Sequence, residues 1–234
     1  MKFAQPLIPA TLLRRYKRFL ADALLDDGTE ITAHCANPGS MMGLKEAGSR
    51  IWLEPNDDPK KKLKYGWRLV DHQNGHMTGV DTSVPNRALR AALMAHQVPE
   101  LAAYKTVRAE VKYGQNSRID FLLTEAGKPD LYVEVKSVTL LREPAKAEFP
   151  DSVTARGTKH LAELTEMVHQ GHRAMMFYLV QRTDADFVTL AEDIDPTYAA
   201  AFDVAIQAGV EVLAYDCQIS PDEILLGAPL PFRR

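Results

Sequence analysis

Two charged residues, Glu134 and Lys136, lie two positions apart within the apolar stretch DLYVEVKSVTL. The stretch is rich in β-branched residues and predicts a β-strand, on which residues two apart point to the same side. A carboxylate and an ammonium group on one face of such a strand are either a structural ion pair or parts of a reactive site. The neighbouring predicted strands bear on this choice.

A second carboxylate, Asp120, lies between two large apolar residues in the preceding predicted strand, SRIDFLLTE. If these two strands pair as a hairpin, Asp120 and Glu134 come close together. Two such carboxylates repel each other unless a cation lies between them, and Mg²⁺ prefers oxygen ligands while keeping several waters. Lys136 would then orient or help to deprotonate an attacking water, or neutralise a phosphate. These parts fit metal-assisted attack on a phosphodiester.

A third acid, Glu110, lies in YKTVRAEVKYG, on the predicted strand before Asp120. Three acids on three successive strands indicate a metal site more strongly than one pair does. We therefore expect Asp120, Glu134 and Glu110 to bind Mg²⁺ or Mn²⁺, with Asp120, Glu134 and Lys136 as the catalytic residues. The residues alone leave open the alternative of a buried ion pair or a half-exposed strand face.

The first 83 residues are rich in short strand-like segments separated by Pro, Asn, Asp and Gly. Such spacing predicts a small barrel or sandwich, and the following Pro85 can open a helix. We therefore expect one domain over 1–83 and a second over 84–234. The strands expected in the first domain are 16–25, 30–35, 50–55, 65–72 and 76–80.

The second domain shows a different pattern, in which three strands follow a helix and then alternate with helices. This order predicts a mixed sheet with helices on its faces. The helices are expected at 86–98, 152–171 and 195–209, and the strands at 104–114, 117–125, 130–140, 173–181 and 210–219.

The spacing of Asp120 from Glu134-Val135-Lys136, with thirteen residues between, resembles the PD-(D/E)xK nuclease signature. The order of helix, three strands, helix and strand is similar to the core of that superfamily. The superfamily also carries an acid on its first core helix, and the expected helix 86–98 contains none. Glu100 follows that helix, and Glu110 is the candidate substitute from a strand.

Longer stretches resemble the bacterial sugar fermentation stimulation protein A family more closely. The resemblance implies an N-terminal OB-fold, a restriction-endonuclease-like C-terminal domain, and DNA binding with little sequence preference. It also implies a regulatory link to the use of sugars, notably maltose. The stretches that carry it are RYKRFLAD, HCANPGSM, EVKYG, SRIDFLL, YVEVKSVTL, FPDSVTARGTKHLAEL and GVEVLAYD, spread from residue 15 to residue 216.

Basic residues gather in two N-terminal segments and at the start of the expected helix 152–171, although the net charge is −3. Local patches decide whether a phosphate backbone can bind, and Ser152 or Thr154 can cap that helix beside an anion site. The alternative is a set of solvated faces. The expected nucleic-acid contacts are Arg14, Arg15, Lys17, Arg18, Lys60, Lys61, Lys62, Lys64, Arg156 and Lys159.

Aromatic residues accompany the N-terminal basic segments, and OB-folds bind single strands by stacking bases on such rings beside a positive groove. Small barrels also bury aromatic residues, so a purely structural role is the alternative. The residues concerned are Tyr16, Trp52, Tyr65 and Trp67.

Several classes of protein are excluded by composition. No apolar run approaches the roughly 18 residues that span a membrane, and the basic N-terminus does not read as a signal peptide. Cys35 and Cys217 lie too far apart in sequence to indicate a disulfide framework or a cysteine zinc site. We expect a cytoplasmic protein that binds DNA, with single-stranded DNA or RNA as the other options, and a homodimer is compatible with the sequence. Three functions remain: a metal-dependent nuclease, a catalytically silent DNA-binding regulator, and a sugar-responsive metabolic protein.

Overall fold

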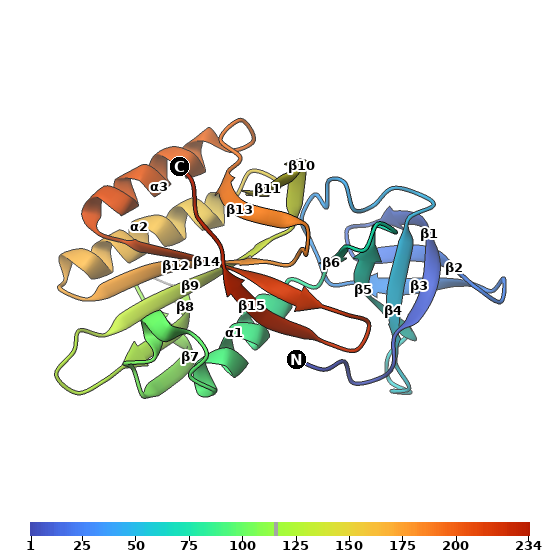
Figure 1. Cartoon of the computed structure of the whole chain (residues 1–234), viewed down its shortest axis with the longest axis horizontal. Coiled ribbons are helices and arrows are strands. Elements are labelled where there is room, and N and C mark those ends of the chain that lie inside the picture. The colour runs from blue at the N-terminus through green and yellow to red at the C-terminus, as the bar shows by residue number, and fades with distance from the viewer. Residues whose placement is uncertain (115–116) are drawn as a thin grey trace.

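The computed structural model describes residues 1–114 and 117–234, and its N-terminal strands curl into a closed barrel (Figure 1). The strand order is β3-β2-β1-β4-β5-β6, and a further pairing of β3 with β5 closes the ring. Alternate residues of these strands point inward, and small side chains such as Ala21 and Ala33 leave room for the fully buried Trp67. The strands are β1 Ile8–Tyr16, β2 Leu20–Leu25, β3 Glu30–Cys35, β4 Arg50–Pro55, β5 Tyr65–Asp71 and β6 Met77–Gly79.

The expected strand 16–25 is confirmed only over Leu20–Leu25, the strand β2, because the chain turns at residues 17–19 between β1 and β2. Lys17 and Arg18 both adopt positive φ, at 46° and 64°. Such hairpin turns usually carry Asn or Gly. Basic residues at these positions gave no turn signal, and the strand β1 before the turn was not expected.

A six-stranded mixed sheet forms the larger, C-terminal part, in the order β15-β14-β12-β9-β8-β7. Strand β12 runs parallel to β9 and β14, and the other pairs are antiparallel. The fold class predicted from the sequence, an OB-like barrel followed by a helix-covered mixed sheet, is confirmed. The strands are β7 Thr106–Tyr113, β8 Ser117–Thr124, β9 Leu131–Val138, β12 Arg173–Val180, β14 Glu211–Ile219 and β15 Ile224–Pro229.

Helices cover both faces of this sheet, with α1 on one side and α2 and α3 on the other (Figure 1). The first helix begins two residues before the expected helix 86–98 and ends four residues before its end. The helices are α1 Val84–Met94, α2 Ala155–His169 and α3 Pro196–Ala208, with a short 3-10 helix at Pro99–Leu101. A second sheet has three strands, β10 Leu140–Glu143, β11 Ala145–Phe149 and β13 Ala185–Leu190. Neither this sheet nor strand β15 was expected from the sequence.

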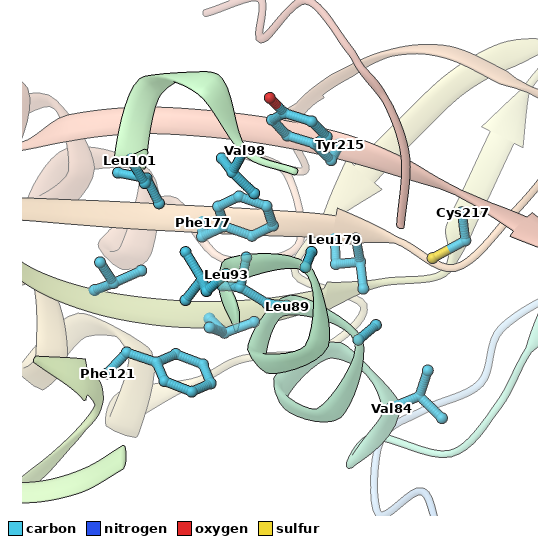
Figure 2. Packing of buried hydrophobic residues seen from close by; sticks show 14 of the residues in the cluster. Val84, Leu89, Leu93, Val98, Leu101, Phe121, Phe177, Leu179, Tyr215 and Cys217 are labelled. Carbon is cyan, nitrogen blue, oxygen red and sulfur yellow. The ribbon is translucent and has the colours of Figure 1, made fainter. Parts of the chain in front are cut away.

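The central strand β12 is buried on both faces, as its unbroken apolar sequence predicts. Leu89 and Leu93 of α1 belong to the same core cluster as Phe177 of β12 and Phe121 of β8 (Figure 2). On the opposite face, Tyr178 belongs to the core beneath α2 and α3. The two cores fix the helices against β8 and β9, the strands that carry the acidic residues.

The barrel is joined to the sheet by direct contacts. Leu69 of the barrel belongs to the core under α1. The backbone N–H of Gly79 donates to the carbonyl of Gln181 at 2.8 Å, and that of Met41 donates to the Asp151 carboxylate at 3.0 Å. Loop 36–44 of the barrel therefore reaches the start of α2. Within the described residues, no helix has the length and apolar character needed to cross a membrane.

Candidate active site

Asp120 and Glu134 lie side by side at the point where β8 and β9 separate. The hairpin register pairs Phe121 with Val133, so the next position along places Asp120 across from Glu134. At this position the side chain of Asp120, rather than a backbone carbonyl of β8, accepts the hydrogen bond from β9: the N–H of Val135 donates to Asp120 Oδ2 at 2.7 Å. The hairpin argument from the sequence thus brings together the two acids that it predicted to meet. They line a cleft of about 380 Å³.

Glu134 is only 3% exposed, and its two carboxylate oxygens have different surroundings. Oε1 accepts from Lys136 Nζ at 2.8 Å and contacts His160 Nδ1. Oε2 is buried without a hydrogen-bond partner among the described residues. Burial acts to raise the pKa of Glu134, but His160 and Lys136 outweigh it and hold the pKa below its usual value. The carboxylate is therefore charged and buried, with one oxygen that no described donor satisfies.

Asp120 is held by two donors and titrates differently. Besides the Val135 N–H, the side-chain amide of Asn86 donates to Asp120 Oδ1 at 2.6 Å. Burial and then repulsion from Glu134 raise the pKa of Asp120 to about 6, although both hydrogen bonds act in the opposite direction. The two neighbouring carboxylates thus repel each other, and a bound cation would offset this repulsion.

Asn86 occupies the first turn of α1, the helix in which the resembled superfamily carries an acid. Its amide contacts Asp120 directly, so this helix contributes a neutral group. Glu100 lies elsewhere and accepts from the Tyr215 hydroxyl at 2.7 Å. The sequence analysis missed the role of Asn86. The available signal was its position directly after Pro85, which places it in the first turn of a helix.

The first turns of α2 place His160 against Glu134 and Arg156 against His160. Of the two caps that the sequence allowed, Thr154 is the one observed, and its Oγ1 accepts from the N–H of Gly157 at 3.1 Å. Arg156 Nε donates to His160 Nε2 at 3.3 Å. Since Nε2 accepts this bond, we infer that Nδ1 carries the proton and donates to Glu134. The contact of His160 with Glu134 was not foreseen.

Glu110 stands apart from the cleft. Its side chain is exposed, its backbone has φ of 55°, and it is not among the residues that line the cleft. In the described part of the chain, no three His, Cys, Asp or Glu side chains form a group that could hold a metal. The structure therefore brings Asp120, Glu134 and Lys136 together without Glu110.

Two carboxylates nevertheless fit a hard divalent cation. Mg²⁺ is commonly held by one or two carboxylates, with waters and substrate phosphates completing its coordination. The unpartnered Oε2 of Glu134 and the nearby Asp120 supply such oxygens. The donor set is all oxygen, which suits Mg²⁺ or Mn²⁺ better than softer metals.

The predicted nucleic-acid contacts fall into three groups. Arg156 lines the cleft, whereas Lys159 lies 3.5 Å from Glu163 on the exposed side of α2. Arg14 pairs with Asp22, and Arg15 donates to two carbonyls of loop 36–44, those of Asn37 and Gly39, and to the carbonyl of Arg18 in the turn between β1 and β2. The remaining residues, Lys17, Arg18, Lys60, Lys61, Lys62 and Lys64, are exposed on two barrel loops.

Comparison with known families agrees with both parts of this fold. Residues 13–80 match the family model described as the SfsA N-terminal OB domain, and residues 83–223 match that of the sugar fermentation stimulation protein RE domain. The class is thus an OB barrel joined to a restriction-endonuclease-like domain. The chain belongs to the sugar fermentation stimulation protein family.

Similar proteins align over their whole length. A sugar fermentation stimulation protein homolog from a Ruegeria species is 71% identical over 99% of this chain and 100% of its own. The homolog from Roseobacter denitrificans is 68% identical over 100% of both chains. The structure of Pyrococcus furiosus SfsA in complex with Ca²⁺ matches with a TM-score of 0.88 at 27% identity, covering 100% of this chain and 98% of that one.

Proposed function

We propose that this chain is a DNA-binding, Mg²⁺- or Mn²⁺-dependent phosphodiesterase whose cleft uses Asp120, Glu134 and Lys136. The observation that carries the proposal is the buried Oε2 of Glu134, which has no partner in the described structure, in a side chain that lines the cleft together with a second carboxylate, Asp120. An unpartnered buried carboxylate oxygen is costly unless a ligand satisfies it. The Pyrococcus furiosus relative, crystallised with Ca²⁺, supports a divalent cation in this family.

Each cleft residue has a separate role in the proposal. A bound divalent cation would act as a Lewis acid on the phosphodiester. Asp120 and Glu134 would hold that cation, and His160 and Lys136 keep Glu134 charged and oriented. The ammonium group of Lys136 would stabilise negative charge that develops on the phosphate. Arg156 at the cleft wall would bind a neighbouring phosphate.

DNA is the proposed substrate, and the two domains divide the work. Residues 1–83 would hold the strand through the lysines and arginines of the barrel loops, and residues 84–234 would cut it. Positive patches neutralise backbone phosphates without reading sequence, which agrees with the low sequence preference that we propose.

A cleavage assay tests the proposal. Labelled single- and double-stranded DNA and RNA would be incubated with Mg²⁺ or Mn²⁺ and either wild type, Asp120→Ala or Lys136→Ala. Glu110→Ala is the matched control, because this acid is exposed and lies outside the cleft lining. We expect Asp120→Ala and Lys136→Ala to abolish cleavage and Glu110→Ala to retain it. A wild type that cuts none of these substrates would contradict the proposal.

The second candidate is a catalytically silent DNA-binding regulator of sugar metabolism genes, including those for maltose. The observation that favours it is the ion pair of Lys136 with Glu134 Oε1, which partly satisfies the site without a cation. In that case Glu134→Ala would leave DNA affinity unchanged or raise it, because the variant removes a negative charge. Retained or raised DNA affinity in this variant, together with a wild type that cuts no substrate in the cleavage assay, would favour this function over the nuclease.

A further inference from the structure

Two aromatic rings lie stacked on the outside of the barrel. Phe19 is 45% exposed and follows the turn between β1 and β2. Its ring stacks on the exposed His34 of β3, with centroids 6.4 Å apart and planes inclined by 14°. The N–H of Cys35 donates to the carbonyl of Phe19 at 2.8 Å and keeps the two segments adjacent. A solvent-exposed ring pair contributes little to the barrel core, so its aromatic faces are available to a ligand.

The turn beside this pair carries two cations in an unfavourable backbone conformation. Arg18 has φ of 64°, and around it the N–H of Phe19 donates to the carbonyl of Lys17 at 2.7 Å, as in a strained γ-turn. The Arg18 guanidinium lies 6.0 Å from the centre of the Phe19 ring. Neither Lys17 nor Arg18 forms an ion pair with an acid of the described residues. The chain therefore presents two unpaired cations where Asn or Gly would fit the backbone better.

A second basic loop, residues 56–64 between β4 and β5, meets the same surface through His34. Strands β3 and β5 run side by side, with His34 opposite Gly66, so β3 lies next to the end of this loop. His34 and Tyr65 line a groove of about 900 Å³, whose basic side chains outnumber its acids. The basic residues are Lys2, Lys61, Lys62, Arg68 and Arg87, and the acids are Glu54, Asp57 and Asp58. Within the described structure, neither Lys61 nor Lys62 forms an ion pair with an acid. One continuous surface thus runs from the turn at 17–19 through the ring pair to loop 56–64.

We propose that this surface binds single-stranded DNA, with unpaired bases stacking on Phe19 and His34 while phosphates contact the two basic loops. Exposed ring faces beside a positive groove are the elements by which single strands are bound without sequence preference. In a duplex the base faces already stack on one another, so the rings would have no face to contact. The inference rests on the proposed function, because it names the substrate class that the barrel delivers to the cleft.

Removing either ring should weaken single-strand binding without changing its salt dependence. Fluorescence anisotropy would follow a labelled oligo-dT binding to the full chain in EDTA, so that no cleavage occurs. Loss of one stacked base weakens single-strand binding by roughly fivefold or more. We expect Phe19→Ala and His34→Ala each to show such a loss, and Phe19→Trp to retain binding. Neither alanine variant removes a lysine or arginine, so the salt dependence should stay near that of wild type.

Two further variants complete the design. Lys61→Ala with Lys62→Ala should weaken binding and also flatten its salt dependence, because fewer phosphates are neutralised. Val204→Ala is the matched control, because Val204 is an exposed apolar residue, 60% accessible, on α3 rather than on the barrel. Its affinity for oligo-dT should equal that of wild type.

The outcomes separate this inference from the nuclease proposal. Wild-type affinity in Phe19→Ala and His34→Ala would overturn the stacking surface whatever the cleft does. Equal weakening for single-stranded and blunt duplex DNA would also overturn it. If oligo-dT binding falls in both variants but wild type cuts no substrate with Mg²⁺ or Mn²⁺, the surface stands and the nuclease proposal fails.

Discussion

Lys136 and His160 converge on the same oxygen of Glu134, Oε1, and leave Oε2 buried without a partner among the described residues. The two donors come from different elements, β9 and α2, so the orientation of the carboxylate depends on the packing of that helix against that strand. This arrangement answers why a carboxylate and an ammonium share one face of an apolar strand. The lysine and the histidine together hold Oε1, so the second oxygen of the carboxylate is left without a partner among the described residues.

His160 is expected to act as a positioning residue for Glu134. Removing its donor in His160→Ala should weaken Mn²⁺ binding by roughly tenfold or more, because partners of metal-ligating carboxylates typically contribute this much. His160→Asn places an amide donor near the former Nδ1 and should recover most of the affinity. Calorimetric titration with Mn²⁺ measures both. Equal affinities of His160→Ala and wild type would show that the contact is only structural.

Asp120 should destabilise the folded chain at neutral pH when no metal is present. Its pKa is about 6 in the fold against an ordinary value of 3.8 in the unfolded chain, so the stability tied to its protonated form is complete below pH 3.8 and is lost as pH rises through 6. The difference corresponds to about 3 kcal/mol at pH 8. Asp120→Asn is neutral at every pH; its amide oxygen can accept from the Val135 N–H, and its NH2 group can donate to the side-chain oxygen of Asn86 once that amide is flipped. It should therefore be more stable than wild type at pH 8.

Urea unfolding in EDTA at pH 8 and pH 4 checks this expectation. The gain of Asp120→Asn should shrink at pH 4, where wild-type Asp120 is largely protonated in the fold. Glu110→Gln serves as the control, since substitutions at exposed positions usually change stability by less than about 0.5 kcal/mol. If Asp120→Asn is less stable than wild type at pH 8, the charged form of Asp120 does not destabilise the fold and the expectation is wrong.

Arg18 in the β1–β2 turn should lower the stability of the fold and strengthen the binding of oligo-dT. Glycine adopts φ of 64° without the steric cost of a Cβ, so Arg18→Gly should stabilise the chain by roughly 1 kcal/mol. The same variant should weaken oligo-dT binding, because it removes an unpaired cation next to Phe19. Arg18→Lys keeps both the charge and the strain and should change neither property much. Thermal unfolding and anisotropy together test the pair of effects. Unchanged DNA affinity in Arg18→Gly would contradict this role of the turn.

The sequence predicted the central part of the candidate site because the argument depended on strand pairing alone. Alternation along β9 placed Glu134 beside Lys136, and one hairpin brought Asp120 across from Glu134. The same alternation does not carry Glu110 into the cleft, because a left-handed backbone at this residue breaks the regular strand geometry. The amino-acid sequence around Glu110 does not indicate such a local irregularity of the backbone.

Contacts between distant elements were beyond sequence reasoning. Asn86 and His160 act through the packing of α1 and α2 on the sheet, which fixes their distances only in the folded chain. On the barrel, Trp67 was a stacking candidate but fills the interior, whereas Phe19 was expected inside a continuous strand. Its exposure follows from the turn at Lys17 and Arg18, where residue types favoured no turn.

Isothermal titration of Mn²⁺ into wild type and Glu134→Gln tests the central claim most directly, because it measures whether the cleft holds a divalent cation. Glutamine keeps the size of the side chain but replaces the charged carboxylate with a neutral amide. We predict saturable binding to wild type and its loss, or a weakening of at least about tenfold, in Glu134→Gln. No binding to wild type, or equal binding to both proteins, would contradict the assignment of this cleft as a metal-dependent phosphodiesterase site.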